Sequence, residues 1–142
     1  MHLSADKITR LYCLPVVLRL ALIGIFGGLG SVVRSLIALA ASKIAGEKAP
    51  WGTLSVNLLG CFLAGIVLYF SIDRPVLTAN ARAAIMTGFL GGLTTFSAFS
   101  SETVMLGRDR QWGIVALSVG ANVFLGVAAV LLGRAAARLV SS

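Results

Sequence analysis

The sequence is poor in charge, histidine and cysteine. Only 12% of its 142 residues are charged, the single histidine is His2, and the two cysteines are Cys13 and Cys61. The cysteines form no CxxC pair and have no histidine nearby, so the sequence offers neither a disulfide framework nor a zinc site. Acid–base catalysis by histidine also has no candidate away from the chain terminus. We therefore predict that the protein is not an enzyme.

Apolar residues, in contrast, are abundant. They make up 58% of the chain, and the mean hydropathy is +0.96. They gather in blocks of about 20 residues, the length that a helix rising about 1.5 Å per residue needs to cross roughly 30 Å of hydrocarbon. We therefore predict an all-α membrane protein with four transmembrane helices, at residues 18–41, 51–71, 83–106 and 112–133. The expected organisation is a leader (1–17), one four-helix domain (18–134) and a short tail (135–142).

The net charge of +7 comes from basic residues that are scattered between the apolar blocks. They do not gather on one face, so we expect no nucleic-acid partner. Basic residues in loops set the orientation of a membrane protein. One side of the four-span arrangement holds seven of them, namely Lys7, Arg10, Arg19, Arg74, Arg82, Arg134 and Arg138. The other side holds four, namely Lys43, Lys48, Arg108 and Arg110. Without Lys7 and Arg10 of the leader, the count is five against four. Because this bias is weak, we hypothesise that the chain inserts in both orientations.

Chain length adds a second constraint. Four short helices can hardly surround a conducting path and still keep polar residues away from lipid. We therefore expect the protein to form an oligomer.

A glycine-rich stretch in the third span predicts an interrupted helix. Gly88, Gly91 and Gly92 come just before Thr94 and Thr95, and glycine lowers helix stability. Broken helices within a membrane are tolerated where the freed backbone lines a cavity or is buried in protein, and unwound carbonyls can then coordinate a cation. The alternative is a face of small residues that packs against another helix, as in GxxxG motifs. The sequence leaves both interpretations open.

Two phenylalanines follow these glycines. Phe96 and Phe99 are three residues apart, so they share one face if the helix resumes there, with Thr95, Ser97 and Ser100 close by. The edge of a phenylalanine ring is electropositive. Two such edges beside a narrow path can replace part of the water around a small anion. Two aromatic residues of an ordinary core have the same spacing, so this alternative also stays open.

Polar residues occur inside the second and fourth spans as well. Thr53 and Asn57 are four residues apart, as are Ser118 and Asn122, so each pair can share a helix face. The side-chain amide of Asn57 offers two N–H donors. A polar track along a pore and polar contacts between packed helices both explain this pattern.

Two charged residues fall within or near the ends of the spans. Arg34 lies in the first span, and Glu102 lies towards the end of the third. Both are candidate functional residues, because exposing a charge to lipid is costly. Arg34 fits an aqueous vestibule, or its side chain extends to the membrane surface.

Three segments together resemble the bacterial fluoride channels of the Fluc (CrcB) family. They are GGLGSVVRS at residues 27–35, GTLSVNLLGCFLAG at 52–65 and GFLGGLTTFSAFSSE at 88–102. Their order and spacing agree with the family. The resemblance implies an antiparallel, dual-topology homodimer with two pores in the bacterial cytoplasmic membrane. It also implies passive export of fluoride, which lowers fluoride toxicity, and a structural sodium ion at the dimer centre.

The resemblance also implies roles for individual residues. Phe96 and Phe99 look like the pore phenylalanines, Asn57 like the pore asparagine and Arg34 like the vestibule arginine. Backbone carbonyls of Gly91 and Thr94 would bind the sodium ion. The other residues that we place along the fluoride path are Thr53, Thr95, Ser97, Glu102, Ser118 and Asn122.

The chain departs from the family pattern in a few places. Ser35 stands where an aromatic residue is common, and Ala98 where serine or threonine often occurs. In the fourth span, Ser118 and Asn122 stand where tyrosine and serine are frequent. These differences affect the expected polar track rather than the resemblance as a whole.

Two other functions fit a protein of four spans. A small multidrug-type exporter, which couples proton movement to drug efflux, needs a carboxylate in its first span, and this sequence has none there. A structural membrane subunit would account for the glycines but would leave Asn57, Phe96 and Phe99 as coincidence.

Overall fold

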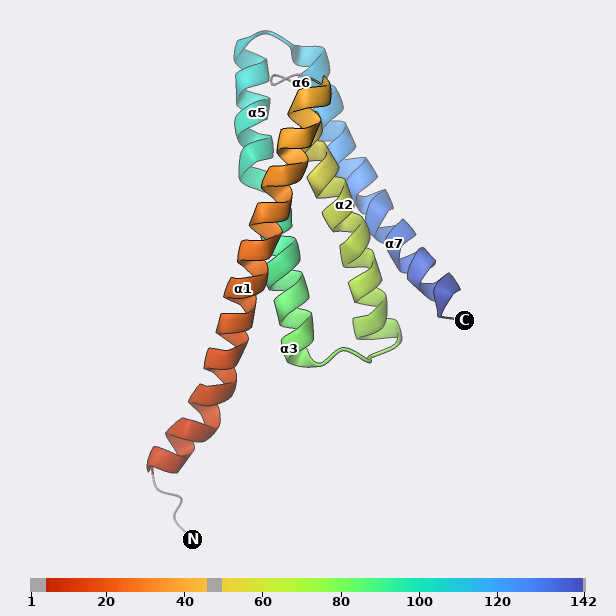
Figure 1. Ribbon diagram of the computed structural model, residues 1–142. Coiled ribbons are helices and arrows are strands. Elements are labelled where there is room, and N and C mark those ends of the chain that lie inside the picture. Colours follow the sequence, from red (N-terminus) through yellow and green to blue (C-terminus); the bar gives the residue numbers. More distant parts are fainter. Residues whose placement is uncertain (1–4, 46–49, 142) are drawn as a thin grey trace.

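The computed structural model describes residues 5–45 and 50–141, which are almost entirely helical (Figure 1). Within this part of the chain, four apolar stretches are long enough to cross a membrane, namely Pro15–Ile44, Trp51–Asp73, Ala79–Arg108 and Trp112–Val140. Successive stretches run in opposite directions in Figure 1, so the start of the first and the end of the last lie at the same end of the bundle. The prediction of an all-helical protein with four apolar spans is confirmed.

The first two stretches are built from α1 (Ala5–Ala45), α2 (Trp51–Leu68) and the π-helical turn η1 (Tyr69–Asp73). Helix α1 begins well before the predicted start at Leu18, because the preceding residues include good helix formers such as alanine, lysine, arginine and leucine. It also continues beyond the predicted end at Ala41. Residues 46–49 of the predicted loop lie outside the described residues. That residues 1–17 lie apart from the four-helix core stays a prediction.

The third stretch consists of α3 (Ala79–Arg82), the π-helical η2 (Ala83–Leu90), α4 (Gly91–Leu93) and α5 (Phe96–Arg108). It begins before the predicted Ala83 because Thr78 caps α3, its hydroxyl accepting a hydrogen bond from the amide of Ala81 at 3.2 Å.

The fourth stretch consists of α6 (Trp112–Gly120), the π-helical η3 (Ala121–Leu125) and α7 (Gly126–Val140). Its helix extends beyond the predicted end at Gly133, since the following run of alanine, leucine and arginine favours helix. Most of the expected tail is therefore helical.

Helix α1 packs along η2 and α4, and glycines permit the close approach. A Cβ atom on Gly88 would lie 2.9 Å from the carbonyl oxygen of Ile23, and a Cβ atom on Gly92 would overlap the carbonyl oxygen of Gly27. Gly88 and Gly92 are one helical turn apart, so they present a single small-residue face to α1. The alternative interpretation of these glycines, a packing face, therefore describes part of their role.

Helices α2 and α7 make the other close contact in the bundle. A Cβ atom on Gly65 would overlap the carbonyl oxygen of Val130, so this helix pair also depends on a small residue. Val56, Leu90 and Leu93 form a buried apolar cluster where α2 meets η2 and α4. Leu93 is fully buried and immediately precedes the point where the third stretch is interrupted.

Large apolar side chains cover the outside of the bundle. On α1 they include Ile25, Leu29, Val32 and Leu36, all more than half exposed. A surface of this kind is stable only when lipid or another protein covers it. Helix α5 packs chiefly against α6, and Figure 1 shows it at the opposite end of the molecule from α3.

We predict that Gly92→Ala lowers the stability of the protein by about 1–3 kcal/mol, because the added methyl group would collide with the backbone of α1. Thermal unfolding of the purified protein in detergent measures this change. Gly24→Ala is the matched control, since a Cβ atom there meets nothing within 4 Å. Equal unfolding temperatures for the two variants would contradict the close-packing interpretation.

Candidate functional site

The third stretch leaves helical conformation at Thr94 and Thr95. Thr94 has φ −85° and ψ 155°, and Thr95 has φ −149° and ψ 115°, so both are extended. Helix resumes at Phe96, and the Thr95 hydroxyl caps it by accepting a hydrogen bond from the amide of Ala98 at 3.1 Å. The interruption follows the glycines rather than containing them, since Gly92 is itself helical.

Asn57 of α2 pairs with this extended segment. Its Oδ1 accepts a hydrogen bond from the amide of Thr95 at 2.9 Å, and its Nδ2 donates to the carbonyl of Thr95 at 3.3 Å. The side-chain amide thus pairs with both backbone groups of one residue, as a neighbouring strand would. Since unpaired backbone groups are costly away from water, this pairing compensates for hydrogen bonds that the helix loses at the break.

The network continues from Asn57 into the fourth stretch. The Asn57 Nδ2 donates to Oδ1 of Asn122 in η3 at 2.9 Å, and the Asn122 Nδ2 donates to the carbonyl of Ser118 at 2.9 Å. Both amide protons of Asn57 are therefore used within the chain. Asn122 keeps one amide proton that has no partner among the described residues.

A cavity of about 350 Å³ opens beside this network. It is lined by Asn57, Cys61, Thr94, Thr95, Phe96, Phe99, Asn122 and Val123. The rings of Phe96 and Phe99 are neighbours, with centroids 5.5 Å apart and planes inclined at 52°. Phe96 is 79% exposed, so the chain itself leaves most of this ring uncovered. The cavity combines two aromatic rings with amide and hydroxyl groups.

A second polar pair lies one helical turn away along α2. The hydroxyl of Thr53 donates to Oε1 of Glu102 at 2.5 Å. Thr53 is buried, and Oε2 of Glu102 is buried without a hydrogen-bond partner among the described residues. The pair therefore contains an unsatisfied acceptor close to the cavity.

The remaining residues proposed from the sequence lie at different distances from the cavity. Ser97 is exposed, and its hydroxyl lies 3.1 Å from the hydroxyl of Thr95. Ser118 is buried and reaches the network through its carbonyl. Arg34 is half-buried on α1 and does not line the cavity.

Two carbonyl groups lose their usual helical donors at the break. The amide of Thr95 donates to Asn57 rather than to the carbonyl of Gly91. The amide of Ala98 donates to the Thr95 hydroxyl rather than to the carbonyl of Thr94. Oxygen atoms freed in this way are suitable ligands for a hard cation, so the residues present fit the sodium site that the resemblance implies.

Sequence reasoning missed two residues of the cavity wall, Cys61 and Val123. Cys61 stands four residues after Asn57, the same spacing that joined Thr53 to Asn57, so periodicity could have identified it. Val123 carries no such signal, because apolar residues are expected throughout a transmembrane helix.

Comparison with known proteins identifies relatives along most of the chain. The sequence model of the family described as "CrcB-like protein, Camphor Resistance (CrcB)" matches residues 21–134. A curated protein of Geotalea daltonii named "Fluoride-specific ion channel FluC" is 40% identical over 118 residues, which cover 83% of this chain and 95% of that protein. The protein of the same name from Geobacter sulfurreducens is 40% identical over 116 residues, covering 82% of this chain and 94% of that protein. Another, from Azobacteroides pseudotrichonymphae, is 41% identical over 115 residues, covering 81% and 92%.

Proposed function

The chain belongs to the CrcB-like family, and we infer from this that it is a fluoride-specific ion channel of a bacterial membrane. Four apolar helices make it a multi-pass membrane protein. Fluoride leaves the cytoplasm through it passively, which lowers fluoride toxicity. The relatives are named ion channels, which agrees with the prediction that the protein is not an enzyme.

The cavity beside the helix break is the feature that best supports this function. A small anion loses strongly held water when it enters an apolar span, and electropositive groups must replace that water. Phe96 and Phe99 offer ring edges at the cavity wall without a fixed positive charge. A buried lysine or arginine would hold the anion too tightly for release, whereas weak sites let it leave.

Asn57 and Asn122 take different parts in this proposal. The amide protons of Asn57 are both engaged, so this residue holds the interrupted backbone in place. The unengaged amide proton of Asn122 is the donor available to an ion in the cavity. Direct donation from Asn57, which the resemblance implies, requires that one of its hydrogen bonds opens as the ion passes.

The other polar residues extend the path on either side of the rings. Thr95 and Ser97 supply hydroxyl groups at the start of α5, and Thr53 and Glu102 continue the polar row along α2 and α5. Arg34 lies in the vestibule, where its charge raises the local anion concentration.

Two chains assemble as an antiparallel homodimer with two pores. Support comes from the incomplete wall of the cavity, since Phe96 is 79% exposed in the single chain. Further support comes from the unpartnered apolar surface of α1. The weak bias of seven basic residues against four is compatible with chains that insert in both orientations.

A sodium ion at the dimer centre is the proposed structural cofactor. The carbonyls of Gly91 and Thr94 supply its ligands, and Gly91 lies on the exposed side of the break. Their release from helical hydrogen bonding supports this assignment. The bound cation would add a positive charge that holds two symmetry-related backbones together.

The alternative of a small multidrug-type exporter is not favoured. Its first span would carry a carboxylate, and Pro15–Ile44 contains none. The curated relatives are named as fluoride-specific channels instead.

We predict that Phe96→Ile and Phe99→Ile each lower fluoride flux by about tenfold, because an interaction of about 1.4 kcal/mol lost at the barrier corresponds to that change. Apolar volume is largely kept, so the variants should still fold. Purified protein in liposomes, with a fluoride electrode and an ionophore to balance charge, measures the flux. Liposomes that contain the unaltered protein should release fluoride rapidly and chloride far more slowly.

Phe124→Ile is the matched control, since Phe124 is largely exposed and does not line the cavity. It should conduct like the unaltered chain. Wild-type flux in both the Phe96 and Phe99 variants would remove these rings from the path. Absence of fluoride flux from the unaltered chain would overturn the channel itself.

We also predict that a tag at the carboxyl terminus is accessible from both sides of the membrane, in roughly equal amounts, because the charge bias that fixes orientation is weak. A membrane-impermeant reagent applied to intact cells and then to lysed cells measures the two populations. A tag found on one side only would exclude the antiparallel dimer.

A further inference from the structure

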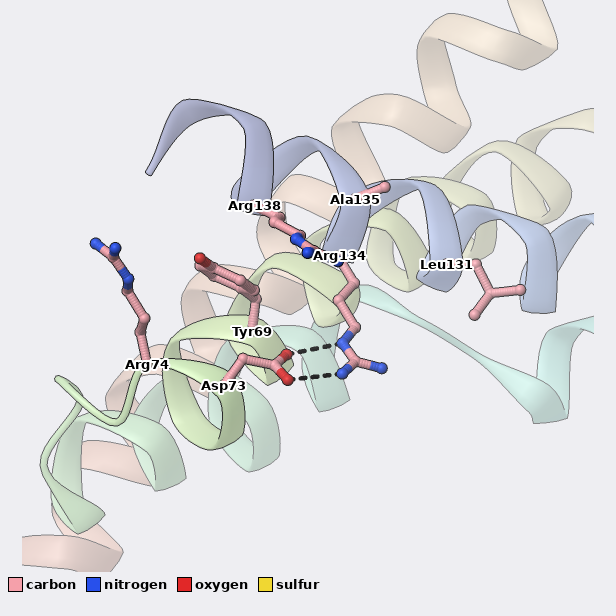
Figure 2. A pocket seen from close by; sticks show the side chains of 7 residues that line it. All are labelled: Tyr69, Asp73, Arg74, Leu131, Arg134, Ala135 and Arg138. Carbon is pink, nitrogen blue, oxygen red and sulfur yellow. Dashed lines mark hydrogen bonds and ion pairs between the residues drawn. The ribbon is translucent and has the colours of Figure 1, made fainter. Parts of the chain in front are cut away.

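A second cavity, of about 510 Å³, lies where the end of α2 and η1 meets α7 (Figure 2). It is lined by Tyr69, Asp73, Arg74, Leu131, Arg134, Ala135 and Arg138. It shares no residue with the cavity that contains Phe96 and Phe99. The channel proposed above therefore leaves this second cavity without a role.

The second cavity has an excess of positive charge. Three arginines and one aspartate leave a formal charge of +2 (three minus one). Arg134 is fixed by Asp73, its Nε donating to Oδ2 at 2.7 Å and its Nη2 to Oδ1 at 2.6 Å. Among the described residues, Arg74 and Arg138 form no ion pair, and in Figure 2 the guanidinium group of Arg74 points away from Asp73.

The other groups of the cavity are suited to a molecule with a polar head and an apolar body. The hydroxyl of Tyr69 forms no hydrogen bond within the described residues, and in Figure 2 it projects from the same cavity wall as Asp73. Leu131 also lines the cavity and is 61% exposed, so α7 presents an apolar side chain next to the arginines. Asp73 is the last residue of the second candidate span, which sets the cavity at the end of the apolar stretch.

We propose that this cavity binds the phosphate group of an anionic membrane lipid. Arginine presents several N–H donors in a planar arrangement that matches phosphate oxygens. Basic pockets between transmembrane helices at the membrane surface are suited to lipid head groups. The apolar side of α7 at Leu131 then contacts an acyl chain, which a free phosphate ion lacks. This proposal does not depend on fluoride conduction.

The test uses the full-length chain, purified in detergent and titrated with phosphatidylglycerol or phosphatidylcholine, with bound lipid counted by native mass spectrometry. The unaltered chain should bind phosphatidylglycerol at least about tenfold more tightly, since each basic residue near the head group contributes to the preference. The double variant Arg74→Gln, Arg138→Gln should lose that preference. Arg134 stays unchanged, because its removal would leave Asp73 without a partner.

The double variant Arg108→Gln, Arg110→Gln is the control of equal charge, since both residues are exposed and lie outside the second cavity. It should keep the preference. Equal affinity of the unaltered chain for the two lipids would overturn the proposal without any variant. If both double variants lost the preference for phosphatidylglycerol equally, the preference would come from net charge and not from this cavity, which would overturn the proposal. Displacement of the lipid by inorganic phosphate at the same concentration would identify a site for free anions instead.

Discussion

The pairing of the Asn57 side chain with the backbone of Thr95 is the interaction on which the site depends. A helix interrupted within an apolar stretch leaves amide and carbonyl groups without water, and each unpaired group costs about 1–3 kcal/mol. One asparagine on the neighbouring helix satisfies two of them. Gly60, one turn beyond Asn57, leaves room for the methyl group of Thr94, so α2 can approach the break closely enough to make the pairing.

The consequences of this pairing extend from the backbone to the cavity. Because the amide of Thr95 turns to Asn57, the helix begins again at Phe96 with a cap of its own. The new start brings Phe96 and Phe99 to the same cavity as Asn122. The same rearrangement releases the carbonyl of Gly91 on the exposed side of the chain. One polar contact thus serves both the proposed ion path and the proposed contact between subunits.

Composition and periodicity were sufficient to predict four spans, because lipid admits few backbone structures other than helix. Asn57, Phe96 and Asn122 were each named from the sequence as one member of a pair on a helix face, and all three line one cavity. Helix ends were less predictable, since alanine, leucine and arginine continue a helix whether or not lipid surrounds it. The use of both Asn57 protons within the chain could not be predicted, because it depends on where η3 places Asn122. The cavity lined by Arg74 and Arg138 could not be predicted either, because the residues that line it are distant in sequence.

Hydrogen–deuterium exchange at the amide of Thr95 tests most directly whether Asn57 holds the break. In the unaltered protein in lipid nanodiscs, this amide should exchange slowly, because it donates to Asn57 at 2.9 Å. In Asn57→Ala it should exchange at least about tenfold faster, as expected when a hydrogen bond worth about 1.4 kcal/mol is lost. The amide of Val56, within α2, should be unchanged. Equal exchange at Thr95 in the two proteins would contradict the account.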